Sequence, residues 1–341
     1  MRPLNIGAGS VANTRTVPVL SRSEALPIGE PVPYHLQAAY AYCRRLTERR
    51  GTNFALGFRH LPPGKRRAIY AAYAFCRFAD DLSDEQGVRL PASGDYRGQA
   101  GQPALLLRRW RQELNRCYRG AAVHPITRAL QDALRRHPIP RDVFEGMIAG
   151  CEADLHRSRY ASFEELLGYC DLVATTIGRI CLTVFGHRPG PHVRRWAREF
   201  AIALQLTNIL RDVGDDLDRG RVYLPQADLR RFGCTGAMLR ARRASPAFLA
   251  LMDFECRRAW RYFRGADRLM PWLSPDARLG ARLMRDVYQA VLAKVQAQPA
   301  VVLRRRFSIT LRERAALVRR ARRQMTAGPR SHLRAPSRAL H

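Results

Sequence analysis

Helical periodicity is the feature of this sequence that most constrains its fold. From about Pro33 onward, apolar residues recur at i, i+3 and i+4 spacing in one segment after another. Pro-rich and Gly-rich breaks separate these segments, and the alternation typical of strands is nearly absent. The pattern predicts helices over 36–50, 64–84, 104–119, 125–136, 140–152, 162–185, 191–217, 246–270, 276–296 and 310–324.

The length and composition of the chain predict a single large domain. Its 341 residues are 46% hydrophobic, which is enough for one large core, and no clean linker divides the periodic region. We therefore expect one all-α domain over 34–310, preceded by a flexible leader at 1–33 and followed by a basic helix and tail at 311–341. No stretch approaches 18 uninterrupted apolar residues, so we expect no spanning helix, and the N-terminus lacks the apolar block of a secretory signal.

The eight cysteines form no C-x-x-C pair. In a chain of this size they are interpreted as reduced, buried thiols, so a cytoplasmic protein is expected.

The positive charge of the chain is large and uneven. The formal net charge is +30, and every basic residue except Lys65 and Lys294 is an arginine. The segment from Val301 to His341 holds twelve arginines and one acid, Glu313. A solvated tail, attraction to anionic lipid headgroups and nucleic-acid binding are the three interpretations. No nucleic-acid-binding motif accompanies the charge, so the first two are favoured and no nucleic-acid partner is expected.

Two acidic stripes interrupt otherwise apolar helical segments. In "YAFCRFADDLSDE", Asp80 and Asp84 are four residues apart and share a helix face, with Arg77 one turn earlier. In "LQLTNILRDVGDDLDRGRVYLP", the three oxygen-bearing residues Asn208, Asp212 and Asp216 fall at i, i+4 and i+8.

An acidic pair on a helix is usually only a solvated face, and that interpretation would suffice for either stripe alone. Two stripes on apolar helices are harder to dismiss, and "DVGDD" is a poor helix former, so it costs local stability. Carboxylate and amide oxygens suit a hard divalent cation such as Mg²⁺.

Arginines lie next to both stripes, at positions 77, 211, 219 and 221. The guanidinium fork matches phosphate oxygens, and a metal held by carboxylates neutralises a departing anion. The residues alone therefore suggest chemistry in which a diphosphate leaves.

These motifs closely resemble those of a known family. The stretches "NFALGFRHLPPGKRRAIYAAYAFCRFADDLSDE" (53–85) and "ALQLTNILRDVGDDLDRGRVYLP" (203–225) resemble the two signature regions of the squalene/phytoene synthase family. The stretches "GMIAGCEADL" (146–155) and "SFEELLGYCDLVATTIG" (162–178) resemble the weaker blocks between them. The resemblance covers roughly residues 36–310 and implies the all-α isoprenoid synthase fold, with both acidic stripes facing a central cavity.

The resemblance also implies roles for particular residues. Asp80 and Asp84 would bind magnesium, or manganese, on one side of the cavity, and the second stripe (Asn208, Asp212 and Asp216) would do so on the other. The residues implied to contact substrate are Arg77 and Arg211 at the diphosphates, Tyr73 near the reacting carbons, Phe54 at the entrance, Asp154 in its acidic block and Tyr288.

Two departures from the family pattern concern the cavity. Asp171 stands where a tyrosine is common and Thr175 where a glycine is common, both on a helix that lines the cavity in the family. The change can alter the product or the ease of the second reaction step, but it leaves both metal stripes intact, so no loss of activity is expected. Asn53 stands where serine is common, and an amide can still hydrogen-bond a phosphate.

The activity implied by the resemblance is magnesium-dependent head-to-head (1′-1) condensation of two prenyl diphosphates. Two geranylgeranyl diphosphates giving phytoene, through prephytoene diphosphate, is the leading hypothesis. The alternative is a C30 enzyme that makes squalene, dehydrosqualene or presqualene diphosphate from farnesyl diphosphate, with NADPH needed only for squalene. A non-catalytic, membrane-associated helical protein is the remote alternative. Greasy substrates and the basic surface also predict peripheral contact with an anionic membrane, at the inner face of the cell membrane.

Overall fold

The computed structural model describes residues 35–50, 52–83 and 103–326. The predicted leader at 1–33, Asp84 and the end of the tail lie outside the described residues. The helices are α1 Leu36–Arg50, α2 Thr52–Phe58, α3 Pro63–Ser83, α4 Pro103–Tyr118, α5 Pro125–Leu134, α6 Arg141–His156, α7 Phe163–Phe185, α8 Val193–Arg211, α9 Val213–Asp218, α10 Gln226–Arg231, α11 Gly236–Arg240, α12 Pro246–Leu269, α13 Pro275–Ala297 and α14 Leu311–Thr326, with short 3₁₀ helices η1 Met270–Trp272 and η2 Pro299–Leu303.

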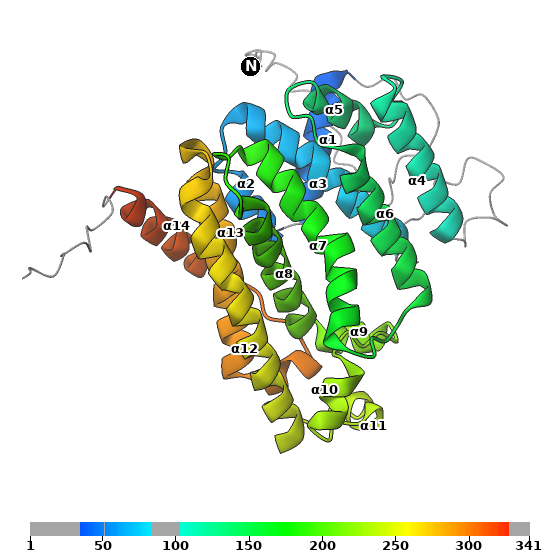
Figure 1. Ribbon diagram of the computed structural model, residues 1–341, viewed down its shortest axis with the longest axis vertical. Helices are drawn as coiled ribbons and strands as arrows, with labels where there is room; N and C mark the ends of the chain where they lie inside the picture. Colours follow the sequence, from blue (N-terminus) through cyan, green and yellow to red (C-terminus); the bar gives the residue numbers. More distant parts are fainter. Residues whose placement is uncertain (1–34, 51, 84–102, 327–341) are drawn as a thin grey trace, which may run out of the picture.

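Helices α7 and α8 run side by side through the middle of the bundle (Figure 1). Helix α8 also packs against α12 and α13, while α7 contacts α3 and α6. Helix α3 in turn packs against α1 and α5. One continuous cluster of buried apolar side chains runs from Ala39 to Ile309, so these helices share a single core.

The prediction of an all-α protein is confirmed. In residues 35–50, 52–83 and 103–326, β structure is limited to two isolated bridges, Arg159 with Val222 and His187 with Leu273. Helix α7 is long and apolar enough to cross a membrane by length and composition alone. Its neighbours α3, α6 and α8 surround much of it, which is the environment of a core helix.

The predicted helix over 191–217 is wrong in one respect, because the chain breaks at Asp212. Helix α8 ends at Arg211, Asp212 has φ −103° and ψ 13°, and α9 begins at Val213. Gly214 and the aspartates around it are poor helix formers. Just past the break, α9 packs closely against η2, since a Cβ on Gly214 would lie 2.7 Å from the carbonyl oxygens of Val302 and Leu303. The second acidic stripe therefore spans two helices that meet at Asp212.

Several short elements are absent from the periodicity-based prediction, namely α2, α10, α11, η1 and η2. Each has seven residues or fewer, which is too short to show an amphipathic repeat. Helix α2 is held by close backbone packing against α13, where a Cβ on Gly57 would lie 2.6 Å from the Gly280 carbonyl oxygen and 2.4 Å from Met284 Cγ.

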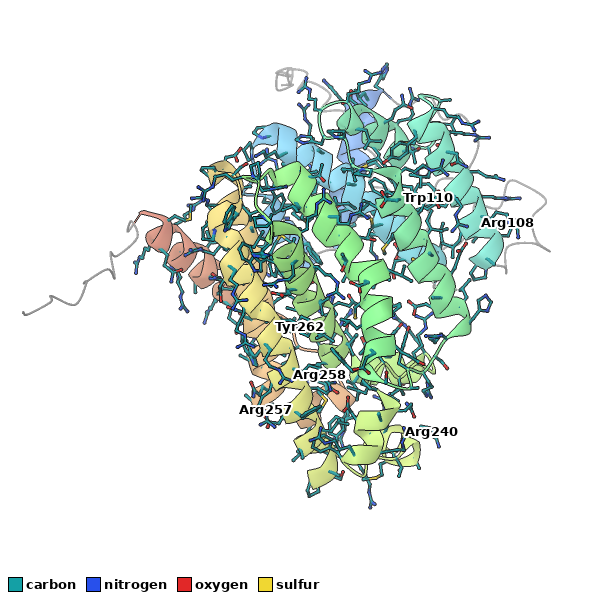
Figure 2. All side chains as sticks on the ribbon, viewed as in Figure 1. Arg108, Trp110, Arg240, Arg257, Arg258 and Tyr262 are labelled. Carbon is teal, nitrogen blue, oxygen red and sulfur yellow. The ribbon has the colours of Figure 1, made fainter. Side chains whose placement is uncertain are left out.

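The arginines are spread over several faces of the molecule, as Arg108, Arg240 and Arg257 illustrate at its edges (Figure 2). Arg258 is different, because it is largely buried. Its guanidinium lies 4.1 Å from the Phe163 ring centroid and 2.8 Å from both Asp228 and Glu255. This ion cluster joins α10 to α12.

The contact between α2 and α13 gives a stability prediction. Gly57→Ala should lower the free energy of unfolding by about 2 kcal/mol, because the new methyl group meets backbone that cannot rotate away. Urea denaturation followed by circular dichroism measures the change.

The matched control is Gly168→Ala on the exposed side of α7, where an added Cβ meets nothing within 4 Å. That variant should be stabilised by about 0.5–1 kcal/mol, because alanine favours helix. Equal effects of the two substitutions would contradict the packing argument.

Candidate active site

A cavity of about 630 Å³ lies between the central helices. Helices α2, α3, α6, α7, α8, α9 and α13 contribute to its walls. It brings together every predicted site residue that the structure describes: Phe54, Tyr73, Arg77, Asp80, Asp154, Asn208, Arg211, Asp212, Asp216 and Tyr288. Asp84 follows the last described residue of α3. The catalytic, substrate and metal roles assigned to these residues remain predictions.

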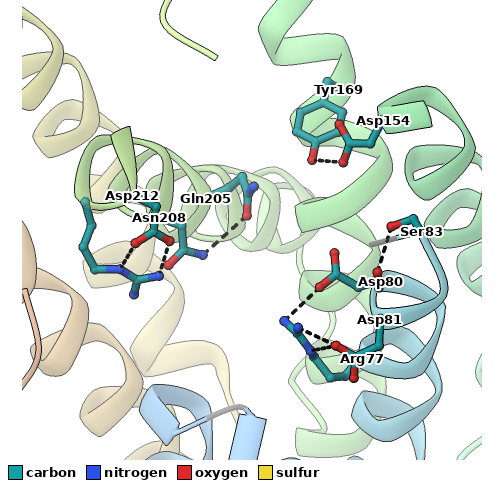
Figure 3. Close-up of polar contacts among 10 residues, drawn as sticks. Arg77, Asp80, Asp81, Ser83, Asp154, Tyr169, Gln205, Asn208 and Asp212 are labelled. Carbon is teal, nitrogen blue, oxygen red and sulfur yellow. Dashed lines mark hydrogen bonds and ion pairs between the residues drawn. The ribbon is translucent and has the colours of Figure 1, made fainter. Parts of the chain in front are cut away.

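On the α3 side, Arg77 binds two carboxylates of its own helix (Figure 3). Its Nη1 lies 2.8 Å from Asp80 Oδ2, and its Nε and Nη2 donate to Asp81 Oδ1 at 3.0 and 2.6 Å. Burial opposes the charge of Arg77, but Asp80 and Asp81 outweigh it and raise the pKa. Asp81, which the sequence analysis did not single out, is thus the buried anchor that orients Arg77.

On the α8 side, Arg211 donates from Nε and Nη2 to the two carboxylate oxygens of Asp212, at 2.7 and 2.5 Å. Asn208, one turn earlier, donates to Gln205 Oε1 at 3.5 Å. Figure 3 places this group across from Arg77 and Asp80. Two helices distant in the sequence therefore present carboxylates and arginines to one space.

Asp216 and Asp212 carry like charges in a poorly solvated place. Burial, and then the charge of Asp212, raise the pKa of Asp216 to about 7. A cation between the two carboxylates would relieve both effects.

The donor atoms of both stripes are carboxylate and amide oxygens, which fit a hard divalent cation. Over residues 35–50, 52–83 and 103–326, no three His, Cys, Asp or Glu side chains converge on one point.

Aromatic rings lie beside the polar groups. The Phe54 ring centroid is 5.3 Å from that of Tyr73 and 5.4 Å from that of Tyr288. Burial raises the pKa of Tyr73, and it raises the pKa of Tyr288 to about 12, so both rings stay neutral. Such faces can stabilise a carbocation without reacting with it. Apolar side chains line other parts of the cavity, including Leu182, Phe185, Phe200, Leu204, Leu273 and Met284.

Asp154 is the carboxylate held by tyrosines. Tyr169 donates to its Oδ2 at 2.7 Å and Tyr223 donates to its Oδ1 at 3.0 Å. Burial raises the pKa of Asp154 to about 6, although both hydroxyls oppose the shift.

Several cavity residues escaped the sequence analysis as site candidates. Tyr169 lies in the quoted stretch 162–178 and Tyr223 in "RGRVYLP" of the stretch 203–225, so their position was a usable signal. Gln205 lies three residues before Asn208 on the same helix face. No motif pointed to Arg306, Phe307 and Ser308, which reach the cavity from the chain between η2 and α14, or to Arg314 in the first turn of α14.

Asp171 and Thr175 lie on α7, and this helix lines the cavity as the resemblance implies. Neither lines it, whereas Val173, Ala174 and Ile177 of the same helix do. Asp171 accepts from Arg198 Nε and Nη2 of α8, both at 2.6 Å, and from Thr175 Oγ1 at 3.0 Å. Asp171 thus joins α7 to α8 through an ion pair.

Comparisons with known proteins agree with this geometry. The family model described as squalene/phytoene synthase matches residues 47–313. A 15-cis-phytoene synthase of Synechocystis is 37% identical over 284 residues, which cover 80% of each chain. A phytoene synthase of Mycobacterium bovis is 33% identical over 301 residues, which cover 86% of this chain and 94% of that one.

Among solved structures, a dehydrosqualene synthase superposes with a TM-score of 0.75 at 27% identity, covering 86% of this chain and 98% of the other. A squalene synthase of Alicyclobacillus acidocaldarius gives a TM-score of 0.68 at 32% identity, covering 78% and 96%.

The raised pKa of Asp154 predicts a pH-dependent stability. A raised folded-state pKa stabilises the fold fully below the unfolded value near 3.8, and this contribution is lost as pH rises through about 6. Asp154→Asn stays neutral, so relative to wild type its free energy of unfolding should rise by about 1.4 kcal/mol between pH 5 and pH 7.5.

Urea denaturation of both proteins at each pH measures this difference, and other titrating groups cancel in the comparison. A difference that does not change with pH would show that Asp154 titrates in its ordinary range.

Proposed function

The chain belongs to the squalene/phytoene synthase family, and we propose that it joins two geranylgeranyl diphosphates head to head to give phytoene. It is a prenyltransferase, and the relatives named phytoene synthase support the C40 product. One observation carries the proposal. Two clusters of carboxylates and arginines face each other across a cavity whose other walls are apolar and aromatic.

The arginines of the cavity are the groups that would bind the two diphosphates. Arg77 and Arg211 are fixed by Asp81 and Asp212, and Arg219, Arg221, Arg306 and Arg314 add further cations. Guanidinium groups match the planar geometry of phosphate oxygens and remain charged at any working pH.

Enzymes of this family work on prenyl diphosphates with a divalent metal. We place magnesium, with manganese as a substitute, at Asp80, Asp84, Asn208, Asp212 and Asp216, where it would supply charge neutralisation of the departing diphosphate. In the structure, Asp80 is paired with Arg77 and Asp212 with Arg211. Substrate would allow these pairs to exchange partners, with arginine going to phosphate and carboxylate to the metal.

The carbon chemistry requires protection from water. The C1–O bond of the first substrate breaks and leaves an allylic cation. The 2,3 double bond of the second substrate attacks this cation, and loss of a proton closes a cyclopropane. The second diphosphate then leaves, and rearrangement with loss of another proton gives the C40 triene. The rings of Phe54, Tyr73 and Tyr288 would face these cations, and the apolar walls exclude the water that would quench them.

The second candidate is a C30 enzyme acting on farnesyl diphosphate. The structural likeness to a dehydrosqualene synthase and to a squalene synthase favours it. Squalene formation would add a reductant such as NADPH as the hydride donor for the last cation. The non-catalytic alternative has no support from the site, because Asp80, Asp212 and Asp216 are all present in the cavity.

Membrane contact at the inner face of the cell membrane is part of the proposal. Helix α14 carries Arg312, Arg319, Arg320 and Arg323 together with the exposed apolar side chains of Leu311 and Met325. Such a helix suits an anionic lipid surface, and the hydrophobic product has to be released into a membrane.

The first experiment is incubation of purified protein with Mg²⁺ and either geranylgeranyl or farnesyl diphosphate, with and without NADPH. A C40 triene from the C20 substrate without NADPH is the expected product by mass spectrometry. EDTA should abolish it, and Asp212→Asn should lower kcat/KM at least 100-fold, which is about 2.7 kcal/mol of transition-state stabilisation. A C30 product alone would establish the second candidate, and no product from either substrate would overturn both.

Asp171 supplies a matched acidic control on the outer side of α7. Asp171→Asn should leave the product and its rate within twofold of wild type, because the residue does not reach the cavity. Stability should fall by less than about 1 kcal/mol, as for other partly exposed ion pairs. A changed product chain length would restore a specificity role for this position.

A further inference from the structure

The chain between η2 and α14 forms one wall of the cavity with little secondary structure of its own. We call residues 304–310 the strap. Its residues Arg306, Phe307 and Ser308 line the cavity, and Arg306 Nε lies 3.6 Å from Asp215 Oδ2. A wall made of irregular chain is placed accurately only if both of its ends are held.

The upstream end of the strap is held by Arg242. Its Nη1 donates to the Leu303 carbonyl oxygen, the last of η2, and its Nη2 pairs with Asp218 at the end of α9. Arg242 has φ +51°, the one left-handed non-glycine residue in the part of the chain that the structure describes. Such a conformation costs about 1–2 kcal/mol, so the surrounding contacts must impose it.

The downstream end is held by Lys294 of α13. Its Nζ donates to the Ser308 carbonyl oxygen at 3.0 Å and contacts Glu313 Oε1 at 2.7 Å. Glu313 and Thr310 form a capping box at the start of α14: Thr310 N donates to Glu313 Oε2 at 2.8 Å, and Glu313 N donates to Thr310 Oγ1 at 3.3 Å. The ammonium of Lys294 therefore joins the strap, the cap of α14 and α13 at one point.

A lysine suits the geometry of this junction between the strap, α13 and α14. Arginine fills every basic position except Lys65 and Lys294. Lys65 makes the same kind of junction, since its Nζ donates to the Phe185 carbonyl oxygen and to Asp276 Oδ1, both at 2.7 Å. A compact ammonium with three rotatable donors can satisfy a carbonyl and a carboxylate in a tight corner, whereas the planar guanidinium is larger and fixed in direction.

We propose that Lys294, together with Arg242 at the other end, is a positioning residue that holds the strap so that Arg306 and Phe307 form the wall beside Asp212 and Asp216. This inference rests on the proposed function, because its consequence is tighter binding of diphosphate in the cavity. Neither residue lines the cavity, so both act only through the strap.

The test compares Lys294→Met, Lys294→Arg and the control Arg282→Met in the full chain. Arg282 Nη1 donates to Gln324 Oε1 at 2.7 Å, so Arg282 also joins α13 to α14. Gln324 lies near the far end of α14, away from the strap at the start of that helix. Three quantities are measured: hydrogen–deuterium exchange of the amides at 304–309, the dissociation constant for inorganic pyrophosphate with Mg²⁺, and the steady-state KM and kcat.

In Lys294→Met, exchange in the strap should accelerate at least tenfold, pyrophosphate binding should weaken about tenfold, and KM should rise with kcat within threefold. Lys294→Arg should recover less than half of the lost affinity. Arg282→Met should match wild type in all three. Faster exchange with unchanged pyrophosphate binding would make Lys294 merely structural, and unchanged exchange would overturn the proposal. If wild type neither turns over prenyl diphosphates nor binds pyrophosphate, the proposed function fails, and the exchange data still decide whether Lys294 holds the strap.

Discussion

Charged groups kept inside an apolar helical bundle are the constraint on which the rest of this structure depends. Removing a carboxylate from water is expensive unless a cation accompanies it. The chain meets this requirement locally, because Arg77 pairs with Asp80 and Asp81 on α3, and Arg211 pairs with Asp212 at the end of α8. Each stripe therefore has an arginine partner next to it in the sequence, which lowers the cost of bringing both groups of carboxylates to one cavity.

Asp216 is the carboxylate of the second stripe that lies past the break at Asp212. Burial, and then the charge of Asp212, raise its pKa and favour its protonated form. Gly214 lies just past this break, where a Cβ would lie 2.7 Å from the carbonyl oxygens of Val302 and Leu303 in η2, and η2 leads directly into the strap. The short helix that carries Asp216 thus packs against the start of the wall that carries Arg306.

The long helices could be predicted from periodicity, and the acidic part of the candidate site from the spacing of two motifs, whereas Phe54, Tyr73, Asp154 and Tyr288 came only from the family resemblance. Periodicity located α1, α3, α7 and α12 to within a residue or two, and the two acidic motifs led to one cavity. The features that the sequence did not predict depend on tertiary contacts. No local rule indicates that Gly57 meets Gly280, that Asp171 turns toward Arg198, or that the strap crosses the cavity, because each partner is distant in the sequence.

The pairing of charges also bears on how such a site can change state. Arg77 is bonded to Asp81 through Nε and Nη2, and to Asp80 through Nη1. Asp81 is buried, whereas Asp80 is more than a third exposed and lines the cavity. Under the proposed function, Asp80 would leave Arg77 for the metal, while Asp81 would keep the guanidinium in place for the diphosphate. A buried anchor and an exchangeable partner on one helix thus let the arginine change ligands without changing position, which is what preorganised binding of a leaving diphosphate requires.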